Sequence, residues 1–458
     1  MNNKLWSGRF KEQTDPLMEK FSASLLFDQK LFDADIAVNK SWARALVQPG
    51  IYTAEEADKV CTALDEIQQD YHAGLLTFPD VEDIHSATEL WLTERTGDVG
   101  ARIHTGRSRN DQVVTDLRLY ISKESRALVN ALTALATLLV EKAEMYVETV
   151  FPGQTHVRQA QPISFAHYLM ALVFQLLRDR DRMYQSLQRC NSLPLGSGAI
   201  AGAAFDIDRQ ALAVSLGFDS VLENSYDATS DRDIVNEVLY ICAQIMLHLS
   251  RVAEDFIFWS SEAYQFIGIH PTYATGSSMM PQKRNPDSLE LIRGKTARVI
   301  GNQVTGLTLL KGIPTAYVRD LQEDKLPLFD SLEQTVSSVQ IFEGVIRTLE
   351  VHADNMLLSL ELDLYATDLA DYLVRKGMPF RQAHSLVGKI VMQAEDTYKT
   401  LEELSLEDYK THSDLFEKDL FELFDPLLSL QKRNITGGTG PLSVEKQIQC
   451  AKDRLDHH

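Results

Sequence analysis

Long stretches of the chain repeat apolar side chains at spacings of three, four or seven positions, which is the pattern of an amphipathic helix. The clearest stretch covers residues 111–150 and contains neither Gly nor Pro. The apolar positions that line one of its faces are Leu117, Ile121, Leu128, Leu132, Leu135 and Leu139. About forty residues in a helix span roughly 60 Å. We therefore predict a helix that packs in a bundle or across subunits, with Asn110 or Asp111 as its cap.

Further helical patterns follow, separated by segments that contain Pro, Gly or Asn, while strand-type alternation is scarce. They cover residues 164–189, 231–266, 288–311 and 326–360. This order predicts an all-α fold in which a central long-helix bundle is flanked by two smaller helical domains. With breaks near Gly106 and Leu364, the predicted domains are residues 1–110, 111–363 and 364–458.

Composition changes this picture little. Hydrophobic residues make up 44% and charged residues 24% of the 458 positions, close to the averages for globular chains. The four cysteines are far apart and form no C-x-x-C pair, which argues against a disulfide framework or a zinc site. The N-terminus lacks the apolar core of a signal peptide, and no apolar run approaches the roughly 20 residues that cross a bilayer. We expect a cytoplasmic protein.

A formal net charge of −20 makes nucleic acid and anionic membranes poor partners. Cationic side chains nevertheless gather in short segments that look like loops. The segment at residues 276–286 combines Gly276 and two serines with Lys283 and Asn285, between Pro281 and Pro286. Glycine lets the backbone move and approach a ligand, whereas the prolines limit where it bends. Such a loop can close over an anionic substrate.

Residues 104–111 precede the longest helix and include Ser108, Arg109 and Asn110. A helix N-terminus carries unpaired N–H groups and a partial positive charge, so these side chains could complete an anion site. A capped helix start with solvated arginines fits the residues equally well.

Two other polar segments carry candidate chemistry. Residues 151–162 form a polar turn between two helical patterns and contain His156, which can change its charge near neutral pH. A lone histidine at a helix junction is more often structural than catalytic. Residues 316–325 concentrate groups able to hold a multiply charged ligand, or form an ordinary charged helix start.

No G-x-x-x-x-G-K-[ST] or H-E-x-x-H pattern occurs, so the sequence predicts neither a phosphate loop nor a catalytic metal. Gly196, Gly198 and Gly202 follow no strand pattern, which makes a dinucleotide site unlikely. These glycines are expected to allow close backbone contacts.

The segment at residues 276–285 resembles the G-S-S-x-M-P-x-K-x-N signature of the fumarase/aspartase superfamily and matches it at every fixed position. Its continuation to Arg293, and the A-Y-x-x-D-x-Q-E-D-K match at residues 316–325, most resemble the argininosuccinate lyase family. The resemblance covers nearly the whole chain. It implies a homotetramer whose long helices form a central core, active sites that each take residues from three subunits, and a reaction without cofactor or metal.

The resemblance also implies roles for individual residues. It makes Ser277 the base that removes a proton, with Lys283 and Asn285 stabilising the resulting charge, and His156 a general acid/base that pairs with Glu290. The residues implied to bind substrate are Ser24, Ser108, Arg109, Asn110, Thr155, Tyr317, Gln322 and Lys325, with Ser24 matching less specifically.

Two further matches, at residues 83–85 and 230–233, are expected only to lie near the site. Gln154 departs from the pattern, since an aromatic residue is expected before Thr155, and this puts local packing in question.

The activity implied is elimination from argininosuccinate to give arginine and fumarate, a step of arginine biosynthesis. An adenylosuccinate lyase-like enzyme would share the fumarate half, but residues 282–284 and 316–325 argue against it. A non-catalytic, delta-crystallin-like structural protein would share the scaffold, yet Ser277, His156 and Lys283 are all present. We expect an active carbon–nitrogen lyase.

Overall fold

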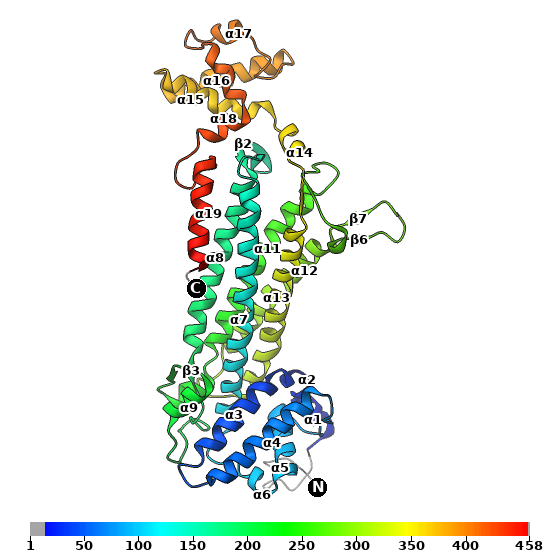
Figure 1. Ribbon diagram of the computed structural model, residues 1–458, viewed down its shortest axis with the longest axis vertical. Coiled ribbons are helices and arrows are strands. Elements are labelled where there is room, and N and C mark those ends of the chain that lie inside the picture. The colour runs from blue at the N-terminus through cyan, green and yellow to red at the C-terminus, as the bar shows by residue number, and fades with distance from the viewer. Residues whose placement is uncertain (1–13, 457–458) are drawn as a thin grey trace. The chain divides into compact units, whose positions relative to one another are not determined.

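The computed structural model describes residues 14–456 and is built almost entirely of helices (Figure 1), which confirms the predicted all-α class. The five longest helices are α7 (Arg109–Met145), α8 (Phe165–Cys190), α11 (Asp233–Trp259), α12 (Asp287–Leu310) and α13 (Lys325–Arg347). The pattern at residues 326–360 does not stay helical throughout. After Arg347 the chain forms a short strand, β8 (Glu350–Val351), and then α14 (Ala353–Leu358).

The chain divides into two compact units, and each of the five long helices contributes residues to both. The first unit comprises Met1–Val129, Asp181–Gln244 and Ala297–Val336. The second comprises Asn130–Arg180, Ile245–Thr296 and Ser337–His458. The division into three domains that the sequence suggested remains a prediction.

Besides its parts of the long helices, the first unit holds short helices and one strand pair. These are α1 (Pro16–Ser22), α2 (Leu25–Asp28), η2 (Gln29–Leu31), α3 (Phe32–Ala45), α4 (Ala54–His72), α5 (Ile84–Thr96), α6 (Asp98–Ala101), β3 (Ser192–Leu193), α9 (Arg209–Leu216), β4 (Ser220–Val221), α10 (Ser225–Ser230) and η4 (Arg319–Asp324). Helix α3 packs against α4 and α5. Phe32 at the start of α3 stacks on Tyr71 of α4 with ring centroids 3.8 Å apart, and its ring is buried. The ring of Phe32 also contacts that of Trp91 in α5, so one aromatic side chain joins the three helices.

The second unit holds the remaining elements. They are β1 (Val150–Thr155), β2 (Arg158–Ser164), β5 (Ile267–Gly268), η3 (Pro271–Tyr273), β6 (Thr275–Gly276), β7 (Arg284–Asn285), β8, α14, η5 (Leu362–Tyr365), α15 (Ala366–Arg375), α16 (Phe380–Asp396), α17 (Leu406–Lys410), η6 (Lys418–Phe424), α18 (Pro426–Gln431) and α19 (Pro441–Asp456). Residues 365–424 form a contiguous hydrophobic cluster around Leu373, Ile390 and Phe416. This stretch therefore has a core of its own.

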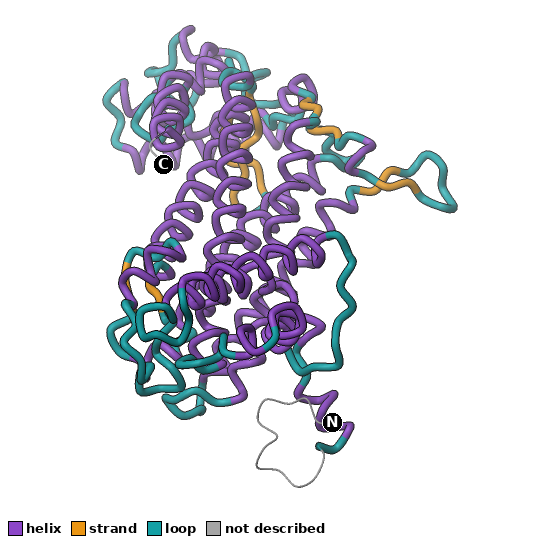
Figure 2. The backbone as a smooth tube through the Cα atoms, turned by 60° about the horizontal axis from the view of Figure 1, so that its bottom comes forward, coloured by secondary structure: helices purple, strands orange, loops and turns teal. Residues whose placement is uncertain are grey.

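The strands occur only as short pairs. β1 and β2 form an antiparallel hairpin, β5 pairs with β8, and β6 pairs with β7, while β3 and β4 are parallel. Figure 2 shows the β6–β7 pair leading into a loop that extends away from the neighbouring helices. Among the described helices, none is both long and apolar enough to cross a membrane.

Candidate active site

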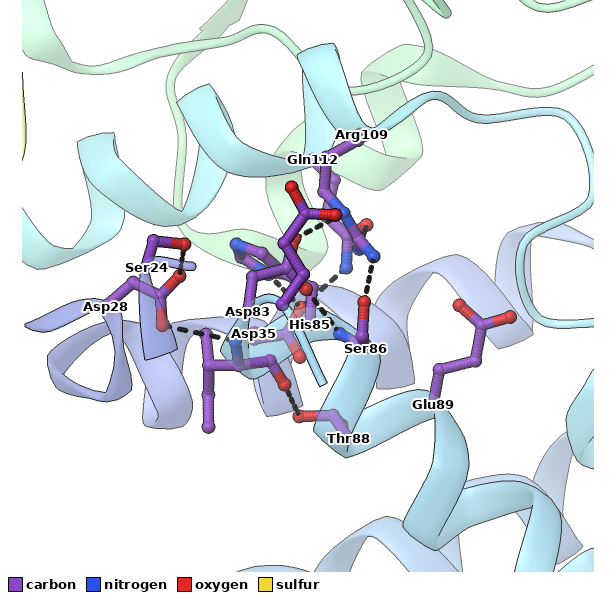
Figure 3. A network of polar contacts seen from close by, with 12 residues as sticks. Ser24, Asp28, Asp35, Asp83, His85, Ser86, Thr88, Glu89, Arg109 and Gln112 are labelled. Carbon is purple, nitrogen blue, oxygen red and sulfur yellow. Dashed lines mark hydrogen bonds and ion pairs between the residues drawn. The ribbon is translucent and has the colours of Figure 1, made fainter. Parts of the chain in front are cut away.

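The guanidinium of Arg109, at the start of α7, is held by three side chains (Figure 3). Its Nη1 donates to Oε1 of Gln112 at 2.8 Å and its Nη2 donates to Oγ of Ser86 at 3.0 Å. Its Nε lies 3.1 Å from Oδ2 of Asp83. Each of the three nitrogens thus has one fixed partner, so the side chain is oriented before any ligand arrives.

Asp83 is the N-cap of α5, and its Oδ1 accepts the backbone N–H of Ser86 at 2.7 Å. Burial would raise the pKa of the Asp83 carboxyl, but the charges of Arg109 and His85 outweigh it and lower that pKa. The cap that starts α5 is therefore also the counter-ion of Arg109.

Ser108 caps α7. Its Oγ accepts the N–H of Asn110 at 3.2 Å, and its own N–H donates to Oδ1 of Asp111 at 2.9 Å. The prediction that Asn110 or Asp111 is the cap was therefore wrong, because Asp111 accepts from Ser108 instead. Oδ2 of Asp111 also accepts the N–H groups of Gly196 and Gly198, at 3.0 and 2.8 Å. Both glycines have positive φ, so the expected close backbone contacts are present.

Asn110 donates from Nδ2 to the carbonyl of Ala199 at 3.2 Å. Ser24 is buried, and its hydroxyl donates to Oδ2 of Asp28 at 2.5 Å. Gln322 donates from Nε2 to the carbonyl of Ser22 at 3.2 Å. The structure thus brings Gln322 of η4 next to the segment that carries Ser24.

Lys325 is buried, and its Nζ lies 2.9 Å from Oδ1 of Asp324. The other oxygen of Asp324 accepts from Nε of Arg232, which belongs to the second match expected near the site. Tyr317 is half-buried, and burial raises the pKa of its phenol. One carboxylate between two buried cations leaves this cluster with an excess of positive charge.

Beneath Arg109 lies a buried group formed by Asp35 of α3, His85 of α5 and Asp116 of α7. Nδ1 of His85 is 3.0 Å from Oδ1 of Asp35 and 3.1 Å from Oδ2 of Asp116. Burial alone would lower the pKa of His85, but the two carboxylates raise it to about 10. The ring is therefore an imidazolium between two acids.

Potential ligand atoms of Asp35, His85 and Asp116 all lie within 4.8 Å of one another, and such donors suit a divalent metal. In the arrangement described, however, the imidazolium supplies the positive charge that a metal would bring.

Ser277 opens the loop between β6 and β7. Its Oγ accepts the backbone N–H groups of Met279 and Met280, at 3.3 and 3.0 Å. Its own N–H donates to the carbonyl of Lys283 at 3.3 Å. The loop is thus folded around the Ser277 hydroxyl, while the side chain of Lys283 is exposed and that of Asn285 is half-buried.

Thr155 and His156 lie at the tip of the β1–β2 hairpin, not at the helix junction that the sequence suggested. Thr155 pairs with Arg158, so His156 and Val157 form a two-residue turn, with φ of 55° and 59°. Gln154 lies at the register shift of the hairpin with its side chain exposed, so its departure from the family pattern leaves the core unchanged.

Glu290, in the first turn of α12, lies 3.9 Å from Nη2 of Arg293. No contact between Glu290 and His156 is present among the residues described in a single copy of the chain. The predicted site residues fall into two sets. The first unit holds Ser24, Ser108, Arg109, Asn110, Tyr317, Gln322 and Lys325, and the second holds Thr155, His156, Ser277, Lys283, Asn285 and Glu290.

Comparison with known proteins identifies the family. The lyase family model matches residues 8–301, and the model of the argininosuccinate lyase C-terminal region matches residues 363–431. An argininosuccinate lyase of Carboxydothermus hydrogenoformans is 45% identical over 99% of this chain and 100% of its own. One from a Geobacillus species is 47% identical over 98% of each chain. The chain belongs to the argininosuccinate lyase family. It is accordingly a carbon–nitrogen lyase.

Solved structures of other lyases have a similar fold. An EDDS lyase in complex with formate is 27% identical, with a TM-score of 0.86 over 97% of this chain and 91% of that chain. A class II fumarase from Schistosoma mansoni, 18% identical, shares the fold with a TM-score of 0.75 over 90% and 92% of the two chains.

The sequence did not single out Gln112, Ser86 or Asp35, although Gln112 and Ser86 hold Arg109 directly. No periodic signal pointed to Gln112 or Asp116 in the longest helix of this argininosuccinate lyase family member, because both lie off its predicted apolar face and are nevertheless fully buried. A polar residue at such a position needs a buried partner.

Proposed function

We propose that the protein cleaves argininosuccinate to arginine and fumarate by anti elimination, without cofactor or metal. The observation that carries this proposal is the environment of the Ser277 hydroxyl, whose oxygen accepts two backbone N–H groups. Those donors would stabilise the oxygen in its deprotonated form. A serine that is to act as a base must reach that form.

In the proposed reaction, Ser277 takes the proton from the carbon next to a carboxylate of the succinate half. The resulting carbanion spreads its charge into that carboxylate and becomes doubly negative. The cation of Lys283 and the amide of Asn285, in the same loop and strand as Ser277, would stabilise that charge. Because Lys283 is exposed in a single copy, closure of the loop over substrate belongs to the proposal.

Arg109, Ser108 and Asn110 would bind a carboxylate of the fumarate half. They lie at the N-terminus of the 37-residue helix α7, where the helix dipole favours an anion. Among the described residues, Arg109 retains one N–H on Nη1 and one on Nη2 without an acceptor. Two such donors match the two oxygens of a carboxylate.

At the other end of the substrate, Tyr317, Gln322, Lys325 and Ser24 would recognise the amino-acid end of the arginine half. The excess positive charge around Asp324 suits the carboxylate of that half, and the Ser24–Asp28 pair suits its ammonium group. His156, assisted by Thr155 and Glu290, would protonate the departing guanidinium nitrogen.

A homotetramer with active sites shared by three subunits also belongs to the proposal. Helix α11 leaves Tyr240, Leu247 and Phe258 exposed by 44%, 38% and 53% in a single chain. On α12, Gly294 and Gly301 lie seven residues apart, and a Cβ on either would meet nothing within 4 Å. Apolar and small side chains along two long helices favour helix–helix association. Contact with other copies would also bring partners to the exposed Thr155 and His156.

The proposal also covers the location of the protein, its domains and its metabolic role. We place the protein in the cytoplasm. We also propose the three domains predicted from the sequence. The separate core of residues 365–424 supports the third of them. We further propose that the enzyme acts in arginine biosynthesis.

The test is the ultraviolet signal of fumarate when purified protein meets argininosuccinate, with adenylosuccinate, malate and aspartate in parallel. We expect fumarate from argininosuccinate alone, and release slower by roughly a thousandfold from the Ser277→Ala variant. Release from another substrate would overturn the roles of Tyr317, Gln322 and Lys325. Silence in every well from a folded wild-type tetramer would favour a non-catalytic, delta-crystallin-like role.

Shared sites need a separate test. Inactive Arg109→Met and inactive Ser277→Ala proteins are dissociated, mixed and reassociated. If a site combines residues from different copies, some sites in the mixture hold both native residues and activity returns. If each chain holds a whole site, no activity returns.

A further inference from the structure

The fully buried amide of Gln112 lies between Asp35 and Arg109. Its Nε2 donates to Oδ1 of Asp35 at 2.6 Å, and its Oε1 accepts from Nη1 of Arg109 at 2.8 Å. Figure 3 shows Gln112 and Arg109 at the start of α7, with Asp35 and His85 beside them. Asp35 makes no hydrogen bond to Arg109 itself, so the hydrogen-bonded path between the two side chains passes through Gln112.

The two neighbours of Gln112 have opposite hydrogen-bonding character. An ionised carboxylate only accepts, and a guanidinium only donates. The two ends of an amide have nearly the same shape, but only one orientation satisfies both neighbours here. A flipped amide would set its carbonyl against Asp35 and its NH₂ against Arg109, with both contacts repulsive.

Asp35 is kept in its accepting form by the charges around it. Nδ1 of His85 lies 3.0 Å from the same Oδ1 that receives Gln112. Burial would raise the pKa of Asp35, but His85 and the buried Arg107 hold it well below its ordinary value. The Asp35 carboxylate is thus a constant acceptor for the Nε2 group of Gln112.

From this geometry we propose that Asp35 is a positioning residue for substrate binding: its carboxylate fixes the orientation of the Gln112 amide, which in turn fixes the Arg109 guanidinium. The inference rests on the proposed function, in which Arg109 binds the fumarate half. Asp83 and Ser86 hold the other two nitrogens of Arg109 and do not touch Asp35. Loss of Asp35 therefore loosens one of three restraints.

The consequence is confined to one half of the substrate. A guanidinium that turns away from its carboxylate loses a bidentate contact, so fumarate binding weakens. The arginine half, which we assign to Tyr317, Gln322 and Lys325, keeps its contacts. A general loss of structure would weaken both halves.

The test measures the dissociation constants of fumarate and of arginine separately, by titration calorimetry on folded tetramers. The Asp35→Asn variant replaces the fixed acceptor by an amide that can offer either end. We expect fumarate to bind about tenfold more weakly and arginine to bind as to the wild type. The matched control is Asp33→Asn, on the same helix, where a half-buried carboxylate also accepts from a glutamine, Gln68, and contacts none of the residues that hold Arg109. It should leave both constants unchanged.

A double-mutant cycle shows whether the effect passes through Gln112. Gln112→Leu removes the amide and should reproduce the selective loss of fumarate affinity. Adding Asp35→Asn to Gln112→Leu should then change the fumarate constant by less than about twofold. A full additional loss in the double variant would overturn the inference, as would an equal loss for both ligands. If Asp35→Asn fails to fold, the Gln112→Leu variant tests the inference by itself. Normal fumarate binding by Gln112→Leu would overturn the inference.

The Arg109→Met variant separates this inference from the proposed function. If it binds fumarate like the wild type, the assignment of Arg109 in the proposed function fails. If it binds fumarate weakly while Asp35→Asn does not, only the role of Asp35 fails.

Discussion

Arg109 and Lys283 are both cations that we assign to substrate, yet the structure holds them in different ways. Arg109 has a partner for each of its three nitrogens, and one of those partners, Gln112, also donates to the carboxylate of the buried Asp35–His85 pair. Lys283 extends its exposed side chain from a loop that is folded only on itself, through Ser277 and Met280. One region is preorganised and the other is not.

The difference shows which part of the proposed reaction each region can serve. Fixed donors bind a ground-state carboxylate at little entropic cost, because they are ordered before the ligand arrives. Exposed groups in a loop with few buried contacts belong to the least stable part of a fold and can rearrange. We infer that substrate binds first to the ordered set, and that the loop and hairpin residues are completed by closure or by another subunit.

The largest effect should come from Ser277→Ala, which tests the less ordered region directly. We expect turnover to fall by roughly a thousandfold, while the protein stays folded, because the change lies in a loop outside the core and leaves no core cavity. The neighbouring Ser278→Ala variant is the control, since the Oγ of Ser277 alone accepts the loop N–H groups. Fumarate release assays measure both, and wild-type turnover in Ser277→Ala would remove Ser277 from the mechanism.

Gly301→Arg should remove most of the activity by a different route. A Cβ at this position would meet nothing within 4 Å in its own chain, so we expect the new side chain to leave the fold intact and to block contacts with other copies. Sedimentation should show dissociation, with activity falling in step. Gly388→Arg, in helix α16, is the matched control, because that exposed helical glycine also has open space around it. An intact, active Gly301→Arg tetramer would contradict the assembly that we propose.

His156→Gln should slow turnover by roughly a hundredfold, because an amide cannot protonate the departing guanidinium nitrogen. His384→Gln changes an exposed histidine of α16 and serves as the control. Fumarate release measures the rates of both variants. If His156→Gln keeps the wild-type rate, His156 has a structural role only.

The smallest effect concerns the preorganised region and is read in stability. The pKa of His85 rises from 6.5 to about 10 in the folded state. A raised pKa contributes stability that is fully present below the unfolded value and is lost as the pH rises through the folded value. The charged groups that act on His85 are Asp35, Asp116, Asp28 and Asp83. Because the pKa of Asp116 is raised from 3.8 to about 7, its own contribution to stability is lost at lower pH than that of His85.

Denaturant unfolding should therefore show a free energy that falls as the pH rises from 6.5 towards 10. This pH dependence should be absent in His85→Asn. Its size in the wild type should be on the order of a few kcal/mol in the free energy of unfolding across this pH range. His72→Asn, at an exposed histidine that contacts Asp33, should keep it. The same slope in His85→Asn and the wild type would refute the imidazolium assignment.

The sequence predicted the long helices because their apolar spacing persists over many turns. It predicted the hairpin at residues 150–164 poorly, because Pro152, Gly153 and three glutamines interrupt the alternation. Strands of two residues, such as β6, carry no periodic signal at all.

The sequence likewise predicted some parts of the candidate site and missed others. Short motifs such as residues 276–285 stand out because rare residue types follow one another in a fixed order. Asp35 and Gln112 are 77 positions apart and meet only when α3 packs beside α7, so no local pattern announces their contact. Only their polar character at buried helical positions could have suggested a partner.

The turn at the tip of the β1–β2 hairpin carries a consequence for protein engineering. His156 and Val157 both adopt positive φ, which costs free energy in any residue with a Cβ and most in a β-branched one. Val157 is 82% exposed, so it gains little burial in return within one chain. Glycine at position 157 would relax the backbone and raise the melting temperature. A library selected for heat resistance alone should therefore soon yield substitutions in this turn. A screen for fumarate release would then show whether the stabilised hairpin still holds His156 in the position that the reaction needs.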